Sequence, residues 1–251
     1  MNRYFIYLSY KGTNYHGWQV QENAVTVQGK LNDALSTLLK EDVNTIGAGR
    51  TDTGVHAKHY VAHFDTITGG LENNPKFLYS LNSIIPVDIS VSKIVSVKPS
   101  ANARFDAILR GYEYIICTRK NPFLLDFAWM YYNSLNINNM QIASDLLLNY
   151  TDFTSFSKTG SDNKTNICKV YQASWTIDGE LIKFNIKANR FLRNMVRAIV
   201  GTLVEVGKGR ITPDNFAEII EAKDRSLAGT SAPANGLYLD VIDYPETIFN
   251  K

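Results

Sequence analysis

Apolar and polar residues alternate in several stretches of the chain, which is the pattern of β-strands with one buried face. In the first stretch Tyr4, Ile6, Leu8 and Tyr10 share one face, and residues 11–14 supply a turn. Alternation predicts further strands at residues 58–65, 89–97, 112–116, 183–188 and 237–242. Because lysine and asparagine alternate with apolar residues in the strand at 183–188, one of its faces is predicted to be polar and basic.

Other stretches place their apolar residues at helical spacing. Leu31, Leu35 and Leu38 lie on one stripe of a predicted helix that Thr26 caps. Further helices are predicted at residues 75–85, 140–148 and 190–206, and after Thr212 and Pro213. Strand pairs, hairpins and intervening helices together indicate the α+β class rather than a doubly wound parallel sheet.

The periodicity is lost between Asn121 and Asn138, and this loop-like stretch divides the chain into two parts of similar length. We expect two similar αβ halves, an N-terminal one at residues 1–120 and a C-terminal one at residues 121–251. The halves are expected to form a continuous mixed, mainly antiparallel sheet with a central cleft. With 45% hydrophobic residues, the 251-residue chain can fill a sizeable core.

The formal net charge is only +2, but the charge is unevenly distributed. Residues 181–210 contain seven Lys and Arg residues against Glu205, a local charge of +6 that leaves −4 for the remainder. Such a basic patch suits an anionic partner such as RNA. The N-terminal stretch has the pattern of neither a signal peptide nor a membrane span, so a soluble cytoplasmic protein is expected. Cys117 and Cys168 are interpreted as reduced core residues.

Gly47, Gly49 and Gly54 surround Arg50 and Asp52 in one short segment. Glycine permits positive φ and close approach to the backbone, and its entropic cost favours a functional loop over an ordinary one. If the segment is extended, Arg50 and Asp52 point to the same side, where the guanidinium keeps the carboxylate ionised. The segment therefore offers Asp52 as a nucleophile. The alternative is a Gly-rich turn with a surface ion pair.

The predicted helix at residues 190–206 separates its apolar residues from a stripe formed by Arg190, Arg193 and Arg197. These arginines have no carboxylate partner four residues away, and they follow the basic strand face. Their guanidinium groups suit phosphates, or one of them a buried carboxylate. The alternative is the solvated face of a surface helix.

Three other motifs have weaker support. His56, His59 and His63 invite a zinc site, but no cysteine or carboxylate completes the ligand set, so core or surface histidines are favoured. The segment at Gly47 lacks the third glycine of a dinucleotide fingerprint and the Gly-Lys pair of a phosphate loop. Residues 52–54 spell the Asp-Thr-Gly of aspartic proteases, yet the neighbouring arginine opposes a dyad that shares a proton.

Seven motifs along the chain occur in a specific order and spacing. They are Tyr15-His-Gly-Trp-Gln19, Ala48-Gly-Arg-Thr-Asp-Thr-Gly-Val-His-Ala57, Ala103-Arg-Phe-Asp-Ala107, Arg110-Gly-Tyr-Glu-Tyr114, Asp152-Phe-Thr-Ser-Phe156, Phe191-Leu-Arg-Asn-Met-Val-Arg197 and Gly236-Leu-Tyr-Leu239. Through them the chain resembles the tRNA pseudouridine synthases of the A type over nearly its whole length.

The resemblance implies roles for five residues. Asp52 is the catalytic aspartate, Tyr112 an active-site tyrosine and Arg197 the arginine paired with the aspartate. Arg50 helps to displace the target base, and Leu237 forms an apolar wall. Asp52, Tyr112 and Arg197 are expected to line the central cleft.

The resemblance also implies a substrate and an assembly. The expected substrate is the anticodon stem-loop of tRNA, bound by a homodimer in which one tRNA bridges two subunits. Further RNA contacts are predicted at Arg104, Arg190 and Arg193. Two rival functions are a non-catalytic RNA-binding module on the same basic patch and, as a lesser one, a dimeric aspartic protease.

Isomerising uridine to its C-glycoside breaks a glycosidic bond, rotates the uracil and rejoins it at C5. Since no redox change or added atom is needed, no cofactor and no metal are implied. A carboxylate nucleophile can attack the ribose or the base, and the sequence does not distinguish the two. The target base must leave its stack, at a cost of a few kcal/mol that stacking on Tyr112 and insertion of Arg50 offset.

The sequence departs from the common pattern of the family in two places. Asn102 stands in Ala101-Asn-Ala-Arg104 where the family commonly has a histidine that contacts RNA. The polar loop at residues 157–165 lacks the usual arginine, with Asn166 in its region. Both differences bear on RNA affinity or choice of substrate rather than on the chemistry.

Overall fold

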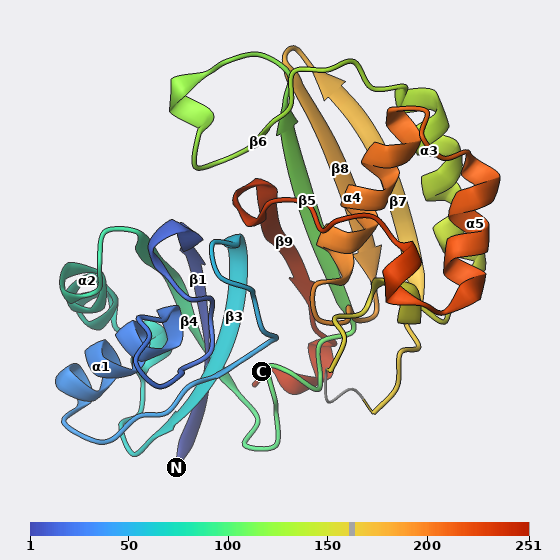
Figure 1. Ribbon diagram of the computed structural model, residues 1–251. Coiled ribbons are helices and arrows are strands. Elements are labelled where there is room, and N and C mark those ends of the chain that lie inside the picture. Colours follow the sequence, from blue (N-terminus) through green and yellow to red (C-terminus); the bar gives the residue numbers. More distant parts are fainter. Residues whose placement is uncertain (161–163, 251) are drawn as a thin grey trace. The chain divides into compact units, whose positions relative to one another are not determined.

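The computed structural model describes residues 1–160 and 164–250 and divides the chain into two compact units. Unit 1 comprises Met1–Ile108 and Leu239–Lys251, and unit 2 comprises Leu109–Tyr238. Both units combine helices with strands of a large, mixed and mostly antiparallel open sheet, which confirms the predicted α+β class (Figure 1). Among the described residues, every helix is too short or too polar to cross a membrane.

The sheet of unit 1 is built on β1 (Asn2–Tyr10). This strand pairs antiparallel with β3 (His56–Thr66) on one side and β4 (Ile89–Val97) on the other. The predicted strand is confirmed, but β1 is buried on both faces, because Phe5 packs edge-on against Tyr244 at a centroid distance of 4.9 Å. Residues 239–250 therefore complete the core of a unit that begins at the N-terminus.

Helices α1 (Val27–Leu39) and α2 (Pro75–Ile84) lie together beside this sheet (Figure 1). The start of α1 is as predicted, since Thr26 Oγ1 accepts a hydrogen bond of 3.2 Å from the amide of Gly29. Pro75 occupies the first turn of α2, and Asn74 caps it through the amide of Phe77.

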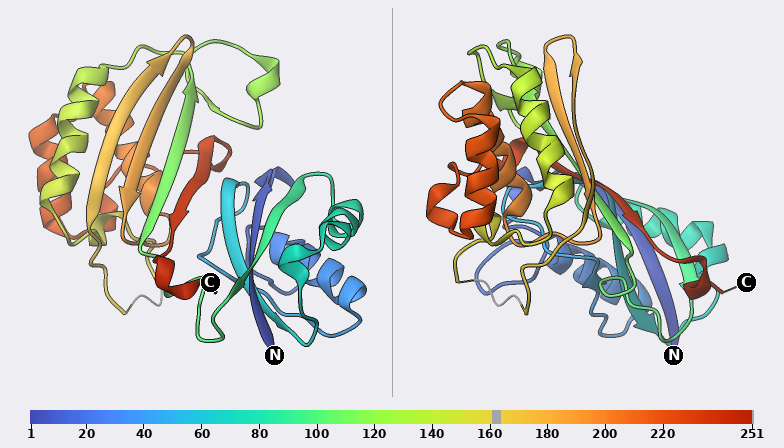
Figure 2. Two further views of the ribbon diagram at one scale, coloured as in Figure 1. Left: turned by 180° about the vertical axis from the view of Figure 1, so that it is seen from behind. Right: turned by 90° about the vertical axis from the view of Figure 1, so that its right-hand side faces the viewer.

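The sheet of unit 2 consists of β5 (Leu109–Cys117), β8 (Leu181–Ala188) and β7 (Val170–Asp178), paired antiparallel in that order. The short strand β6 (Trp129–Met130) runs parallel to β5. Helices α3 (Ile137–Leu146), α4 (Met195–Gly207) and α5 (Pro213–Ala222) lie on one side of this sheet (Figure 2).

The two faces of β8 differ as predicted. Its apolar residues Phe184 and Ile186 are fully buried, whereas Lys183, Asn185 and Lys187 are half-buried on the opposite face. The predicted core cysteines are also confirmed: Cys117 and Cys168 are both buried as free thiols, and burial raises the pKa of Cys168 to about 11.

Strand β9 (Leu237–Asp243) begins in unit 2 and continues into unit 1. It contains the predicted strand at residues 237–242 and is buried over most of its length. Strand β2 (Ile46–Gly47) pairs antiparallel with β3 in unit 1.

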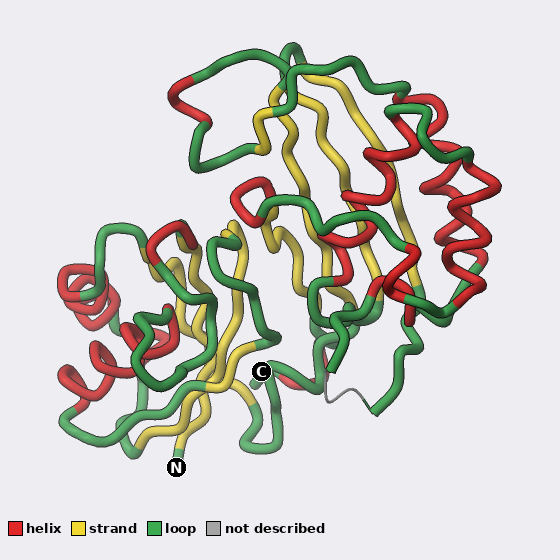
Figure 3. Tube along the Cα trace, in the orientation of Figure 1, coloured by secondary structure: helices red, strands yellow, loops and turns green. Residues whose placement is uncertain are grey.

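The predicted helix at residues 190–206 is wrong at its start. Helix α4 begins at Met195, and the chain just before it is a loop (Figure 3). The helix begins there because Asn194 adopts the left-handed conformation (φ 66°) and donates through its side chain to Ser231 Oγ at 2.6 Å. Leu192 is buried although it lies in the loop before α4, so its apolar side chain matches the spacing of a helical residue. Arg190 and Arg193 therefore lie in the loop before α4, and the three arginines do not form one helical stripe.

Candidate active site

The loop that carries Asp52 joins β2 to β3. It leaves the sheet after Ala48, whose amide donates to the carbonyl of Val61 at 2.8 Å, and it returns at His56. The amide of Val55 donates to the carbonyl of Asp52 at 3.1 Å, which closes a tight turn. Asp52 is half-buried and Arg50 is exposed.

Residues 12–18 pack against this loop, backbone to backbone. The amide of Trp18 donates to the carbonyl of Thr51 at 3.4 Å, and the amide of Gly54 donates to the carbonyl of Tyr15 at 3.3 Å. A Cβ atom on Gly17 would lie 2.2 Å from the carbonyl oxygen of Thr51, which leaves no room for a side chain. The motif at residues 15–19 is thus the support of the Asp52 loop.

Three aromatic side chains hold the same loop from within the unit. The hydroxyl groups of Tyr10 and Thr51 are 2.9 Å apart, and the hydroxyl of Tyr60 donates to the carbonyl of Gly49. Trp18 stacks on Tyr60 with ring centroids 4.2 Å apart. These contacts hold the backbone of the loop that carries Asp52.

The three glycines of the loop serve different purposes. A Cβ atom on Gly47 would lie 2.2 Å from Tyr60 Oη and 2.5 Å from Trp18 Nε1, so this glycine is needed for packing. Gly54 has a positive φ of 79°. A Cβ atom on Gly49 would meet nothing within 4 Å.

Two of the three clustered histidines are buried hydrogen-bond acceptors. His56 Nδ1 accepts from the amide of Gly12 at 2.9 Å, and His63 Nδ1 accepts from the amide of Ala103 at 3.1 Å. Desolvation by burial is the main cause that lowers the pKa of His63 to about 4, so its ring stays a neutral acceptor at neutral pH. His56 and His63 are core residues, as favoured from the sequence.

In unit 2, Tyr112 lies on β5 opposite Ile186 of β8. Its half-buried ring stands perpendicular to the ring of Phe191, with centroids 5.1 Å apart and an interplanar angle of 89°. The loop before α4 thus holds the tyrosine ring in one orientation. Leu237 is buried at the start of β9.

Arg197 lies on the first turns of α4 and is half-buried. Its Nε donates to the carbonyl of Ala232 at 2.8 Å, and the amide of Ala232 donates back to the carbonyl of Arg197 at 2.9 Å. Burial raises the pKa of Tyr114, and the charge of Arg197 lowers it in part, which places that charge near the tyrosine. Arg197 is therefore attached to Ala232 through both its side chain and its backbone carbonyl.

The other predicted RNA contacts differ in exposure. Arg193 and Arg104 are exposed, whereas Arg190 is half-buried. The carbonyl of Arg193 accepts from the amide of Lys158 at 3.1 Å, which fixes the loop before α4.

The residues at the two sequence departures have structural partners. Asn102 Oδ1 accepts from the amides of Arg104 and Phe105, so it shapes the turn that presents Arg104. Asn166 Nδ2 donates to Thr154 Oγ1 at 3.0 Å. The loop at 157–165 includes residues 161–163, which lie outside the described part of the chain.

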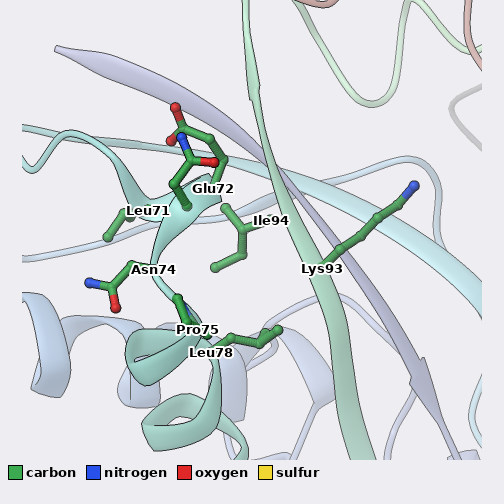
Figure 4. Close-up of a pocket in the computed structure, with 8 residues that line it drawn as sticks. Leu71, Glu72, Asn74, Pro75, Leu78, Lys93 and Ile94 are labelled. Atoms are coloured by element: carbon green, nitrogen blue, oxygen red, sulfur yellow. The ribbon is translucent and has the colours of Figure 1, made fainter.

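A small hollow elsewhere in unit 1 is lined by residues of α2, β4 and the preceding 3-10 turn, including Leu71, Glu72 and Lys93 (Figure 4). None of the eight residues that line it is a predicted site residue.

Comparison with known proteins finds relatives that match nearly the whole chain. The chain is 52% identical over 254 residues to a tRNA pseudouridine synthase A of Bacteroides thetaiotaomicron, covering 100% of this chain and 94% of that protein. It is 52% identical to the tRNA pseudouridine synthase A of Bacteroides fragilis over 99% of each chain. The chain belongs to the tRNA pseudouridine synthase family. A more distant member, from a Thermoanaerobacter species, is 44% identical over 97% of this chain and 100% of its own length.

Residues 144–245 also match the sequence model of the family described as tRNA pseudouridine synthase. Membership confirms the resemblance from which the site residues were named. It favours the isomerase over the RNA-binding module and over the aspartic protease. Within this family member, Asp52 and Arg50 belong to unit 1, whereas Tyr112, Arg197 and Leu237 belong to unit 2.

Reasoning from the sequence assigned no supporting role to the residues that hold the predicted site residues in place. Gly12, Gly17 and Tyr60 shape the Asp52 loop, and Phe191 and Ala232 hold Tyr112 and Arg197. The spacing of Gly12 and Gly17 around Tyr15 was the available signal for the first group. The carbonyl of Ala232 has no signature in a sequence.

Proposed function

We propose that the protein isomerises uridine to pseudouridine in the anticodon stem-loop of tRNA. The observation that carries the proposal is the 52% identity, over the full chain, to proteins named tRNA pseudouridine synthase A. In the net reaction the N1–C1′ bond is replaced by a C5–C1′ bond, C5 loses its proton and N1 gains one. The proposal needs no cofactor, since no atom is added and no electron is transferred.

The proposal gives each site residue one task. Asp52 is the nucleophile that forms a transient bond to the ribose or the base. Arg197 is the cation that the family resemblance pairs with the aspartate, and Tyr112 is the surface on which the flipped base stacks. Arg50 fills the vacancy that the base leaves, and Leu237 is an apolar wall.

The local geometry of Asp52, Tyr112 and Arg50 supports their tasks. A nucleophile needs a fixed position, and the Asp52 loop is held by residues 12–18 and by Tyr10 and Tyr60. A stacking surface needs a fixed ring, and Phe191 orients Tyr112. An inserting side chain needs freedom to reach the RNA, and Arg50 is exposed.

The proposed assembly is a cytoplasmic homodimer that binds one tRNA across two subunits. It follows from the family resemblance and from the excess positive charge of residues 181–210.

The test is to incubate the purified protein with unmodified tRNA transcripts and to map pseudouridine chemically. We expect modification of uridines in the anticodon arm, in buffer without an added cofactor and with a chelator present. Binding of tRNA without product would support the RNA-binding module instead. Peptide cleavage that pepstatin inhibits would support the protease.

Arg190 and Arg193 give a second test, on the salt dependence of binding. Replacing both by Ala should lower the slope of log K against log salt by about 0.7–0.9 for each phosphate that the variant no longer binds. Filter binding of a tRNA transcript over a salt series measures the slope. Arg210→Ala is the control, because it removes a positive charge from the same segment at an arginine that pairs with Glu205 at 2.9 Å. An unchanged slope in the double variant would identify the two arginines as solvated surface residues.

A further inference from the structure

Residues 118–128 of unit 2 form a loop that stands away from the sheet between β5 and β6 (Figure 1). The side chains at its tip are apolar and exposed: Phe123 is 86% exposed and Leu125 is 56% exposed. Arg119 and Lys120 are exposed just before them, and Asp126 is exposed just after. The 118–128 loop therefore presents an aromatic ring beside two cations and one carboxylate.

The first half of the 118–128 loop is tied to the turn between β7 and β8. The amide and hydroxyl of Thr118 both donate to the carbonyl of Glu180, at 2.9 and 3.0 Å. Asn121 Nδ2 donates to Glu180 Oε1 at 2.7 Å, and Asn121 Oδ1 accepts from the amide of Phe123 at 3.0 Å. The backbone that carries Phe123 is thus held in a capped 3-10 turn.

The second half is tied to the segment around Leu237. Asn235 Nδ2 donates to the carbonyls of Leu125 and Ala128, each at 2.9 Å. The hydroxyl of Tyr238 donates to the carbonyl of Phe127 at 2.6 Å. Asn235 and Tyr238 therefore connect the 118–128 loop to Leu237, the residue assigned as an apolar wall.

This arrangement fits stacking on a nucleic-acid base. An ordered loop loses little further entropy when its exposed ring meets a ligand, and every base offers a π-face to an aromatic ring. Cations beside the ring suit the phosphates that flank a stacked base. Phe123 and Leu125 are exposed close together on an ordered loop and have charged residues beside them, and apolar patches with a polar rim mark interaction sites.

We propose that the 118–128 loop is a second tRNA contact, in which Phe123 stacks on a base outside the target position and Arg119 and Lys120 bind adjacent phosphates. The inference rests on the proposed function, because it takes the same tRNA as its ligand. It assigns the loop to binding and orientation of the RNA, and the chemistry stays with Asp52.

Phe123→Ala tests the proposal in binding experiments with a tRNA transcript. The dissociation constant should rise about fivefold or more, the loss expected for one stacked base. Tyr79→Ala is the matched control, since Tyr79 is an aromatic residue on α2 of unit 1 that is 76% exposed. In Phe123→Trp, tRNA should quench the indole fluorescence of the new side chain.

Asn235→Ala tests whether tRNA binding depends on how the 118–128 loop is held. Removing the two hydrogen bonds to Leu125 and Ala128 should weaken tRNA binding, and this effect should disappear in the Phe123→Ala background, because both changes act through one ring. Sedimentation and chemical denaturation of each variant report the oligomeric state and the fold.

The outcomes separate this inference from the proposed function. An unchanged dissociation constant in Phe123→Ala would overturn the loop assignment even if the protein forms pseudouridine. A changed subunit stoichiometry with unchanged tRNA affinity would assign the loop to a subunit contact and overturn it equally. If the wild type binds tRNA through Phe123 but forms no pseudouridine, the loop assignment stands and the proposed function fails.

Discussion

Asp52→Asn is expected to abolish pseudouridine formation and to leave tRNA binding intact. The amide has the size of the carboxylate but no charged oxygen that can bond to the ribose or the base. Losing a nucleophile removes about 10³-fold or more of the rate. Removing one negative charge does not weaken the attraction to RNA, so the dissociation constant should stay the same or fall. Chemical mapping of anticodon-arm transcripts measures the product, and filter binding measures the affinity.

Asp42→Asn is the matched control for this variant. Asp42 is an exposed aspartate of the same unit, outside the Asp52 loop, and its replacement changes the net charge by the same amount. It should form product at the wild-type rate. Product at that rate in Asp52→Asn would remove the nucleophile assignment, whereas loss of binding in that variant would give Asp52 a role in holding the RNA.

Gly17→Ala is expected to destabilise unit 1 by about 3 kcal/mol, the sum of a strained backbone and a steric clash. Gly17 has a φ of 84°, and its Cβ atom would lie 2.2 Å from the carbonyl oxygen of Thr51, next to Asp52 in the chain. Relief of the clash must displace either residues 12–18 or the Asp52 loop. Pseudouridine formation should therefore fall even in the folded fraction of the variant. The midpoint of chemical denaturation and the rate per folded molecule measure the two effects.

Two other glycines of unit 1 separate the backbone strain from the steric clash in this loss of stability. Gly70 has a φ of 75° but open space around its Cβ position, so Gly70→Ala should lose about 1 kcal/mol through the backbone alone. Gly49 has neither a positive φ nor a neighbour within 4 Å, so Gly49→Ala should leave the stability nearly unchanged. Equal losses for Gly17→Ala and Gly70→Ala would show that the contact with Thr51 relaxes without cost.

Local signals in the sequence predicted the elements of the fold well. Thr26 before a leucine stripe gave the start of α1, and Thr212 with Pro213 gave that of α5, where Thr212 and Asn215 form a capping box. These signals act within a few residues, so they can be recognised without the rest of the chain.

The start of α4 could not be predicted in this way. Leu192 is buried although it lies in a loop, and a buried loop residue can have the same spacing signal as a helical one. The left-handed Asn194, which delays the helix, bonds to Ser231, 37 residues later in the chain. A break that depends on so distant a partner leaves no mark in a local window.

In the candidate site, too, some features follow from a local motif and others from contacts between distant segments. Asp52 was found from its motif, and the surrounding glycines were interpreted as signs of a functional loop. The structure shows a different reason for a glycine at position 47, because Trp18 and Tyr60 occupy the space where a side chain would lie. Which neighbour excludes a side chain depends on packing between distant segments, which periodicity does not describe.

The split composition of unit 1 affects the order in which a growing chain can mature. Residues 1–108 are synthesised first, but Tyr244 supplies a ring against Phe5, and its hydroxyl donates to the carbonyl of Ala103 at 2.6 Å. Unit 2 is contiguous at residues 109–238 and is synthesised before the residues that make these contacts. The unit that carries Asp52 can therefore complete its core only after the whole of unit 2 has been synthesised.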